Sequence, residues 1–285
     1  MTESRATATV LTTGLAFPEC PRWHQGELWV SDMHTGEISR IDPKDGSLSV
    51  AFRVPGSAAG LGWDAEGRTY AVSMTDRAVY RWSVGEPERF VDMRPVSGSR
   101  TNELENDRRG GFFVSNVGFS LTKEPPRPTV LVRISPQGEV AVVAEDLICP
   151  NGMAVSRDGD ELLVAESYAD RITRFRIDDD GCLHDREVLV QFRDGEHPDG
   201  IDRDARGGIW AAVMGSPEVR HFGPDGTEDM RLVTSQPAWA CRLGDDGRLY
   251  ICTSSGMDLA ELDRRPGRIE VADVNVTPAK PEEED

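Results

Sequence analysis

The sequence has few basic residues and no long hydrophobic run. It contains 32 Lys and Arg against 50 Asp and Glu, which gives a formal net charge of −18. A nucleic-acid binder needs cationic side chains to neutralise phosphates, so this balance argues against nucleic acid as a partner. The apolar runs are far shorter than the roughly 20 residues that cross a bilayer, so we expect no membrane partner either.

Signals for secretion and for cysteine or serine chemistry are also missing. Residues 1–10 lack the basic and then apolar order of a signal peptide. The five cysteines are widely spaced without a C-x-x-C pair, which favours reduced thiols over a disulfide framework or a thiolate zinc site. No G-x-S-x-G motif occurs, so a serine nucleophile elbow is not indicated. We expect a cytoplasmic protein, and the sequence leaves its oligomeric state open.

Long helical periodicities are scarce, and a turn followed by an apolar strand recurs instead. The 28 Gly and 18 Pro are spread along the whole chain, as is typical of many short strands and turns. The recurring strand carries a large apolar residue every 40 to 50 positions. These anchor residues are Trp29, Tyr70, Phe113, Leu163, Trp210 and Tyr250.

Six units of this length predict an all-β fold, a six-bladed β-propeller of four-stranded antiparallel blades. A β-sandwich would not produce six similar steps. The last unit lacks an outer strand after 268–274, so we expect residues 8–15 to supply it and close the ring. A single domain over 8–276 follows, with residues 277–285 as a disordered acidic tail.

The residues just before the innermost strands of a propeller meet at one end of its channel. Four of the six positions here carry a carboxylate or an amide, whose oxygens suit a hard divalent cation such as Ca²⁺, Mg²⁺ or Mn²⁺. Zinc held through oxygens is a further alternative, and Asn-Gly and Asp-Gly are also common turn dipeptides. The six positions are Glu19, Gly60, Asn102, Asn151, Asp199 and Ala238/Trp239.

Four short segments in this order resemble the senescence marker protein (regucalcin)/gluconolactonase family of six-bladed propellers. They are 19–23 (E-C-P-R-W, where the family has E-G-P), 100–103 (R-T-N-E, close to R-x-N-D), 151–156 (N-G-M-A-V-S) and 198–201 (P-D-G-I).

The resemblance implies one divalent metal ion with three protein ligands, Glu19, Asn151 and Asp199. It implies that Asn102 contacts a metal-bound water or the substrate and that Arg100 orients the substrate. A divalent cation polarises an ester carbonyl and lowers the pKa of bound water, and Asp199 could accept the proton of that water.

Two departures from the family motifs bear on the substrate. Cys20 replaces the usual glycine, and Glu103, a candidate substrate contact, replaces a shorter aspartate. The stretch 115–121 is apolar and aromatic, which predicts a less polar substrate than a sugar acid lactone. Phe119, Trp239 and Tyr168 are candidates for an apolar pocket wall, and the long loops 116–129 and 254–267 are expected to cap the pocket.

The resulting hypothesis is a metal-dependent hydrolase that opens a lactone or related cyclic ester. One alternative is a strictosidine synthase-like enzyme that performs a non-hydrolytic reaction with Glu103 or Glu166 as acid/base. Another is a non-enzymatic propeller that binds calcium or a protein partner. His197 and His34 are weaker candidates for supporting roles at the same mouth.

Overall fold

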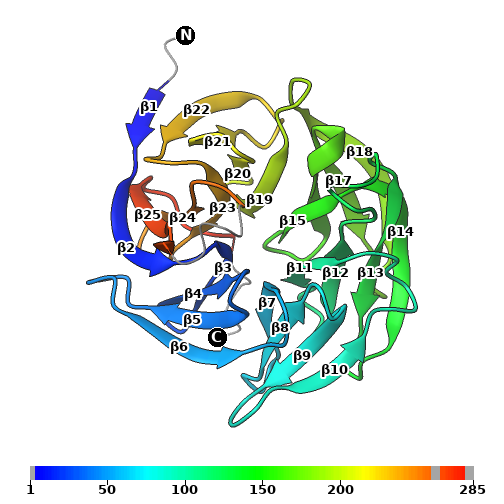
Figure 1. The fold of residues 1–285 in the computed structure, drawn as a ribbon. Helices are drawn as coiled ribbons and strands as arrows, with labels where there is room; N and C mark the ends of the chain where they lie inside the picture. Colours follow the sequence, from blue (N-terminus) through cyan, green and yellow to red (C-terminus); the bar gives the residue numbers. More distant parts are fainter. Residues whose placement is uncertain (1–3, 258–263, 280–285) are drawn as a thin grey trace, which may run out of the picture.

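The computed structural model describes residues 4–257 and 264–279, which form six sheets arranged in a ring around a central axis (Figure 1). Four of the sheets contain four consecutive antiparallel strands, a fifth adds a parallel strand from the N-terminus to four such strands, and the sixth combines three consecutive strands with one from the N-terminus. The innermost strand of each sheet contacts the innermost strands of both neighbours, so the ring closes on itself. This confirms the predicted six-bladed propeller.

The first three blades follow one another directly along the chain. Their strands, from the axis outward, are β3 (Pro18–His24), β4 (Glu27–Asp32), β5 (Glu37–Ile41) and β6 (Leu48–Arg53) in blade 1; β7 (Ala58–Trp63), β8 (Thr69–Ser73), β9 (Ala78–Trp82) and β10 (Glu88–Asp92) in blade 2; and β11 (Thr101–Asn106), β12 (Phe112–Asn116), β13 (Pro128–Ile134) and β14 (Val140–Ile148) in blade 3.

The last three blades have the same order with additions from the N-terminus. Their strands are β15 (Pro150–Val155), β16 (Glu161–Glu166), β17 (Arg171–Ile177) and β18 (Leu183–Gln191) in blade 4; β19 (Pro198–Arg203), β20 (Ile209–Val213), β21 (Glu218–Phe222), β22 (Glu228–Val233) and β1 (Ser4–Thr7) in blade 5; and β23 (Ala238–Leu243), β24 (Arg248–Thr253), β25 (Gly267–Asp273) and β2 (Thr9–Leu15) in blade 6. A short 3-10 helix, η1 (Ser167–Ala169), follows β16.

The N-terminus closes the ring as expected, and it also adds a strand to blade 5, which the sequence did not indicate. Strand β2 pairs antiparallel with β25, which confirms that the N-terminus supplies the outer strand of blade 6. Strand β1 then continues onto blade 5, where it pairs parallel with β22. The chain thus joins blades 5 and 6 along their outer edges.

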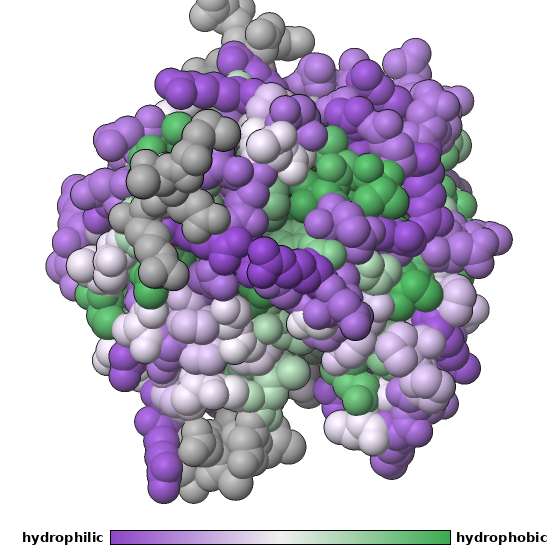
Figure 2. All heavy atoms as spheres, turned by 90° about the horizontal axis from the view of Figure 1, so that it is seen from above, coloured by the Kyte–Doolittle hydropathy of each residue, from purple (hydrophilic) through white to green (hydrophobic). Residues whose placement is uncertain are grey.

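Six apolar clusters fill the spaces between neighbouring blades. The cluster between blades 1 and 2, for example, joins Trp29 and Phe52 to Leu61 and Tyr80. Large anchor residues of the repeat, such as Trp210 and Tyr250, are almost completely buried. Because each sheet buries both faces against its neighbours, the blades stabilise one another. Figure 2 shows the edge of the ring, where hydrophilic residues dominate and hydrophobic ones form separate patches.

Part of the predicted tail is bound to the body of the propeller. Ala279 N–H donates to the carbonyl of Arg203, and Ala205 N–H donates to the carbonyl of Thr277. The Arg108 guanidinium also donates to the Ala279 carbonyl at 2.6 Å. The expectation of disorder is therefore wrong for 277–279, because these backbone groups complete hydrogen bonds of blades 3 and 5. Residues 280–285 lie outside the described part of the chain.

Each innermost strand carries an irregularity at the same place. The pairing between the first and second strands of every blade shifts register just after the first or second residue of the inner strand. Such a β-bulge bends a strand and changes the direction of its side chains. Six bulges at one level therefore turn six side chains toward the axis.

None of the helices in the part of the chain that the structure describes is long and apolar enough to cross a bilayer.

Candidate functional site

The second residue of each innermost strand lines one cavity on the propeller axis. This cavity encloses about 670 Å³, including the part open to solvent. The six second residues are Glu19, Ala59, Asn102, Asn151, Asp199 and Trp239. In blade 2 the repeat pattern predicted Gly60 at this position. Strand β7 begins at Ala58, so Ala59 occupies it and that assignment was off by one residue.

The Asn-Gly and Asp-Gly dipeptides of this site lie inside strands and not in turns. Asn151 and Gly152 belong to β15, and Asp199 and Gly200 belong to β19. A Cβ atom at Gly152 would collide with the backbone of β19, and one at Gly200 would collide with Ala240. Glycine is required here because adjacent inner strands approach closely, and not because a turn needs it.

Hydrogen bonds connect the polar side chains of the cavity floor. Nδ2 of Asn102 donates to Oδ1 of Asn151 at 3.0 Å. Nδ2 of Asn151 donates in turn to Oδ1 of Asp199 and to Oγ of Ser167. The Ser167 hydroxyl donates to the carbonyl of Pro198 at 2.7 Å, which fixes its orientation. Blades 3, 4 and 5 thereby hold three of the predicted site residues in one connected group.

Two carboxyl groups at this floor carry strongly perturbed pKa values. Burial, together with the negative charges of Asp199 and Glu103, raises the pKa of Glu19 well above its usual range. Burial and the charge of Glu103 likewise raise the pKa of Asp199, although the hydrogen bond from Asn151 acts in the opposite direction. Within the described residues, neither carboxylate forms an ion pair with a basic side chain. The charge of Arg22 lowers the pKa of Glu19, but burial and the neighbouring carboxylates outweigh it, so the described part of the site concentrates negative charge without an ion pair.

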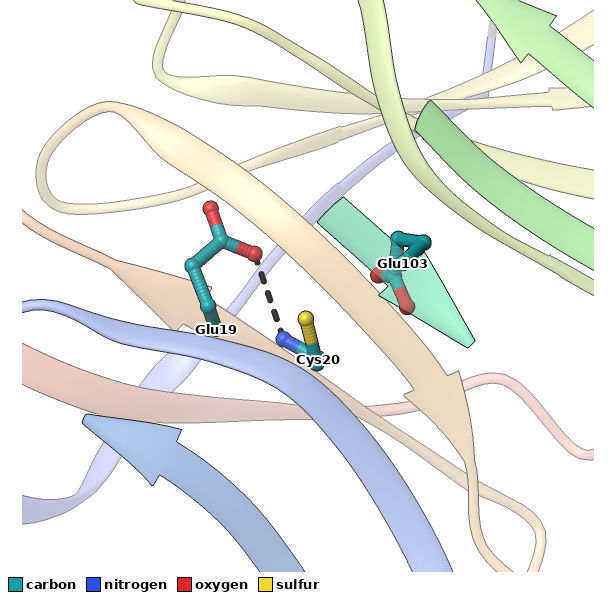
Figure 3. A group of neighbouring side chains, drawn as sticks. All are labelled: Glu19, Cys20 and Glu103. Carbon is teal, nitrogen blue, oxygen red and sulfur yellow. Dashed lines mark hydrogen bonds between the residues drawn. The ribbon is translucent and has the colours of Figure 1, made fainter. Parts of the chain in front are cut away.

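A second group of possible ligand atoms includes Glu19 and lies next to this floor (Figure 3). Ligand atoms of Glu19, Cys20 and Glu103 lie within 4.8 Å of one another. The Cys20 backbone N–H donates to Oε2 of Glu19 at 3.2 Å. Cys20 adopts a φ of 49°, a left-handed conformation that favours glycine and explains why glycine is usual here. Burial, followed by the charge of Glu103, raises the pKa of the Cys20 thiol.

Glu103 is already neutralised by an arginine. Nη2 of Arg22 lies 3.0 Å from Oε2 of Glu103 and also donates to the carbonyl of Leu104 at 2.7 Å. Both side chains are almost completely buried. Glu103 is the third residue of β11, one position past the residues that line the cavity, so its carboxylate lies among the inner strands. The predicted substrate contact therefore lies behind the cavity floor.

The remaining predicted substrate contacts differ in where they lie. Arg100 and Trp239 line the cavity, and the indole N–H of Trp239 donates to the carbonyl of Ser254 at 3.1 Å. Phe119 is 3% exposed and packs edge-on against Tyr168, with ring centroids 5.3 Å apart. Tyr168 lines the cavity. Phe119 thus supports the wall from behind, and Tyr168 forms it.

Both long loops contribute to the cavity. Leu121, from the loop between β12 and β13, and Met257, from the loop after β24, are among the lining residues. This agrees with the expectation that the loops cap the pocket. Residues 258–263 of the second loop, which include Leu262, lie outside the described part of the chain.

Sequence reasoning missed a second sixfold set, which we call the wall ring: the residue directly after the second strand of each blade. Its backbone N–H donates in every blade to the carbonyl of the residue that precedes the inner strand. Four of its members are apolar and line the cavity. The wall ring consists of Met33, Met74, Val117, Ser167, Met214 and Ser254. Each of these residues lies four positions after an anchor residue of the repeat, so the same repeat could have identified the wall ring from the sequence.

Other acid/base candidates are occupied by structural contacts. Glu166 accepts hydrogen bonds from Arg171, Arg186 and Thr173, which do not leave it free as an acid or base. His197 stacks on Tyr168, with ring centroids 4.7 Å apart, and its Nδ1 lies 2.6 Å from Oδ1 of Asp170. His197 thus supports the cavity wall from outside.

Comparison with known proteins agrees with this architecture. A 6-deoxy-6-sulfogluconolactonase of Pseudomonas putida is 26% identical, and the match covers 83% of this chain and 82% of that protein. A pentonolactonase of Haloferax volcanii is 28% identical over 87% of this chain and 84% of its own length. The solved structure of regucalcin, a calcium-binding protein of Agrobacterium tumefaciens, is 19% identical and superposes with a TM-score of 0.82, covering 96% of this chain and 97% of its own.

The family model described as the SMP-30/gluconolactonase/LRE-like region matches residues 17–255. This match spans all six blades, from the start of β3 to the end of β24, and includes every residue of the cavity floor. The chain belongs to the SMP-30/gluconolactonase/LRE-like family.

Proposed function

We propose that the protein is a lactone hydrolase whose cavity holds one divalent cation between Glu19, Asn151 and Asp199, with Ca²⁺ as the first choice. Two relatives that match more than four-fifths of the chain are named as lactonases, which supports the reaction class. The observation that carries the cation is the pair of neighbouring carboxyl groups, half-buried Glu19 and buried Asp199, with raised pKa values and no ion-pair partner among the described residues.

The residues at the floor fit a hard cation. Two carboxylates and one amide converge there, and oxygen ligands of this kind suit Ca²⁺, Mg²⁺ or Mn²⁺. The neighbouring set of Glu19, Cys20 and Glu103 fits less well. The raised pKa of Cys20 keeps its thiol protonated, and Arg22 already neutralises Glu103. We therefore favour the oxygen set that lines the cavity.

A bound divalent cation would polarise the ester carbonyl and lower the pKa of water at the site. The chain's own residues perform the remaining tasks. Asp199 accepts a proton from the attacking water, whose oxygen bonds to the carbonyl carbon as the ring C–O bond breaks. The ring oxygen leaves with a proton, so that one water and one lactone give one hydroxy acid. Arg100 and Asn102 orient the substrate by hydrogen bonds from the cavity wall.

Ring opening of a lactone panel, followed by acid release, tests this proposal. We expect activity in the presence of Ca²⁺, Mg²⁺ or Mn²⁺, loss with a chelator, and recovery when the cation is restored. Asp199→Asn should reduce kcat/KM about 1000-fold, because one substitution removes both a ligand and the proton acceptor. Titration calorimetry with the cation alone should show a parallel loss of affinity in this variant.

Asp170→Asn serves as the matched control, since Asp170 is a carboxylate of the neighbouring blade 4 that contacts His197 and not the cavity floor. Full turnover by both Asp199→Asn and Glu19→Gln would overturn the proposal. A folded protein that binds no divalent cation would also overturn it.

A further inference from the structure

The walls of the cavity above its floor contain few groups that could bind hydroxyls. The apolar members of the wall ring that line the cavity come from four different blades, so they surround the ligand and do not form one patch. They are Met33, Met74, Val117 and Met214. The two loops add Leu121 and Met257 at the mouth.

The polar members of the wall ring are already used inside the protein. The Ser167 hydroxyl donates to the Pro198 carbonyl and accepts from Asn151. The Ser254 carbonyl accepts the indole N–H of Trp239, and the Ser254 hydroxyl lies 3.4 Å from the carbonyl of Gly256. Neither serine is left to bind a substrate hydroxyl.

Polar side chains of the lining are concentrated in two places, and the Tyr168 hydroxyl is one further polar group on the wall. Glu19, Asn102, Asn151 and Asp199 form the floor, where the reacting ester must lie under the proposed function, and Arg100 supplies a cationic group. A sugar lactone carries a hydroxyl on nearly every ring carbon and needs a partner for each one. A hydroxyl buried against methionine and valine would lose its hydrogen bonds to water without replacement.

We propose that the substrate is a lactone whose ring carries a hydrocarbon substituent, an alkyl or aryl group, in place of the hydroxyls of a sugar lactone. This rests on the proposed function, because the floor groups fix the ester and leave the substituent against the apolar walls. The apolar lining extends from the wall ring to Leu121 and Met257 at the mouth, so a substituent that projects from the ring meets apolar side chains along its length. Methionine is well suited to line such a wall, because its flexible thioether adapts to apolar groups of varied shape.

A series of γ-lactones tests the substrate class. The compounds are γ-butyrolactone, its derivatives with alkyl chains of one, three and five carbons, and an aldono-γ-lactone. We expect kcat/KM to rise about three- to fourfold for each added methylene until the cavity is filled. We expect the aldonolactone to be slower than the alkyl lactones by at least about fivefold for each hydroxyl without a partner.

The outcomes separate this inference from the proposed function. If no lactone is opened by the cation-loaded protein, the proposed function fails. If the aldonolactone is opened faster than every alkyl lactone, the function stands and the substrate class is wrong. A rate that does not depend on chain length also contradicts the inference.

Polar substitutions in the wall sharpen the test. Val117→Thr is nearly isosteric and places a hydroxyl in the wall, and Met214→Gln places an amide there. Each should lower the ratio of kcat/KM for the five-carbon derivative to that for γ-butyrolactone by about fivefold. A ratio does not depend on the fraction of folded protein, so partial unfolding cannot produce this result.

Val84→Thr makes the same chemical change at a residue that is 83% exposed, in the turn between β9 and β10, and should leave the ratio unchanged. An unchanged ratio in both wall variants would overturn the inference, even if both proteins remained fully active on γ-butyrolactone.

Discussion

Two levels of the central channel carry acidic side chains, and they differ in how the charge is compensated. At the cavity floor, Glu19 and Asp199 have no ion pair within the described residues. Deeper in the channel, a second acidic group lies on the same inner strands and is interleaved with arginines. Its ion pairs are Arg22–Glu103 at 3.0 Å, Arg22–Glu105 at 3.3 Å, Arg242–Glu105 at 3.5 Å and Arg242–Asp202 at 3.5 Å.

The difference separates a structural charge network from a functional one. Buried carboxylates are tolerated when a cation lies beside them, and the deeper level supplies its own through Arg22 and Arg242. The floor places two carboxylates together with no arginine at ion-pair distance among the described residues, which costs stability unless a ligand compensates them. A protein that neutralises one level and not the other leaves the second available for an external cation.

The largest effect on stability is expected from breaking the deeper network. Arg22→Met removes the cation and leaves Glu103 and Glu105 buried, so the free energy of unfolding should fall by about 3–5 kcal/mol in urea denaturation. Arg40→Met is the control, because Arg40 and Glu27 form an exposed pair 3.8 Å apart that contributes about 1 kcal/mol or less. Equal losses in the two variants would mean that the channel network has no special role.

A smaller effect on the free energy of unfolding is expected from the pH-dependent ionisation of the two carboxyl groups at the cavity floor. The folded-state pKa values of Glu19 and Asp199 are raised, so the stability they contribute is complete below the unfolded carboxyl value of about 4 and is lost as pH rises through their folded values. With a chelator present, the double variant Glu19→Gln/Asp199→Asn should therefore gain stability over the wild type as pH rises above about 4. Urea denaturation at several pH values measures this difference.

Saturating Ca²⁺ sharpens the same comparison. It should reverse the order of stability at neutral pH, because only the wild type binds the cation, and a concentration of 100 times Kd adds about 2.7 kcal/mol. A difference that is independent of pH with chelator, or unaffected by Ca²⁺, would contradict the assignment of the floor carboxylates.

The smallest effect, a change in cation affinity, is expected from Cys20, the residue between the two levels. Cys20→Ala removes the thiol from the alternative ligand set and leaves Glu19, Asn151 and Asp199 in place. We expect cation affinity, measured by titration calorimetry, to change less than threefold, whereas Glu19→Gln should abolish binding. A large loss of affinity in Cys20→Ala would move the cation toward Glu103.

Much of the fold could be predicted because the repeat is a local signal. Each anchor residue, such as Trp210, lies in a short strand next to a turn, and six similar strands leave few architectures. The strand that closes blade 6 could be inferred from a missing partner. The strand β1 could not, because its parallel pairing with β22 depends on the path of the chain across the outer edge.

The sequence predicted which residues of the repeat form the candidate site, but not the exact strand boundaries or the ion pairs around it. Glu19, Asn102, Asn151 and Asp199 could be grouped because they recur at one position of the repeat. The position of Ala59 was missed by one residue, since a strand boundary depends on the neighbouring blade. The ion pair between Arg22 and Glu103 could not be predicted. These residues are 81 positions apart, and their pairing depends on how the inner strands pack across the channel.

Six β units in one ring, with oxygen-bearing side chains at the start of their inner strands, follow from the amino-acid sequence, because the period and the phase of a repeat are properties of the chain alone. Which carboxylates form ion pairs depends on distances between residues of different blades, so this became visible only in the folded protein. The tertiary structure also decided that the walls above the floor are apolar, because bulges and loops set which side chains face the axis.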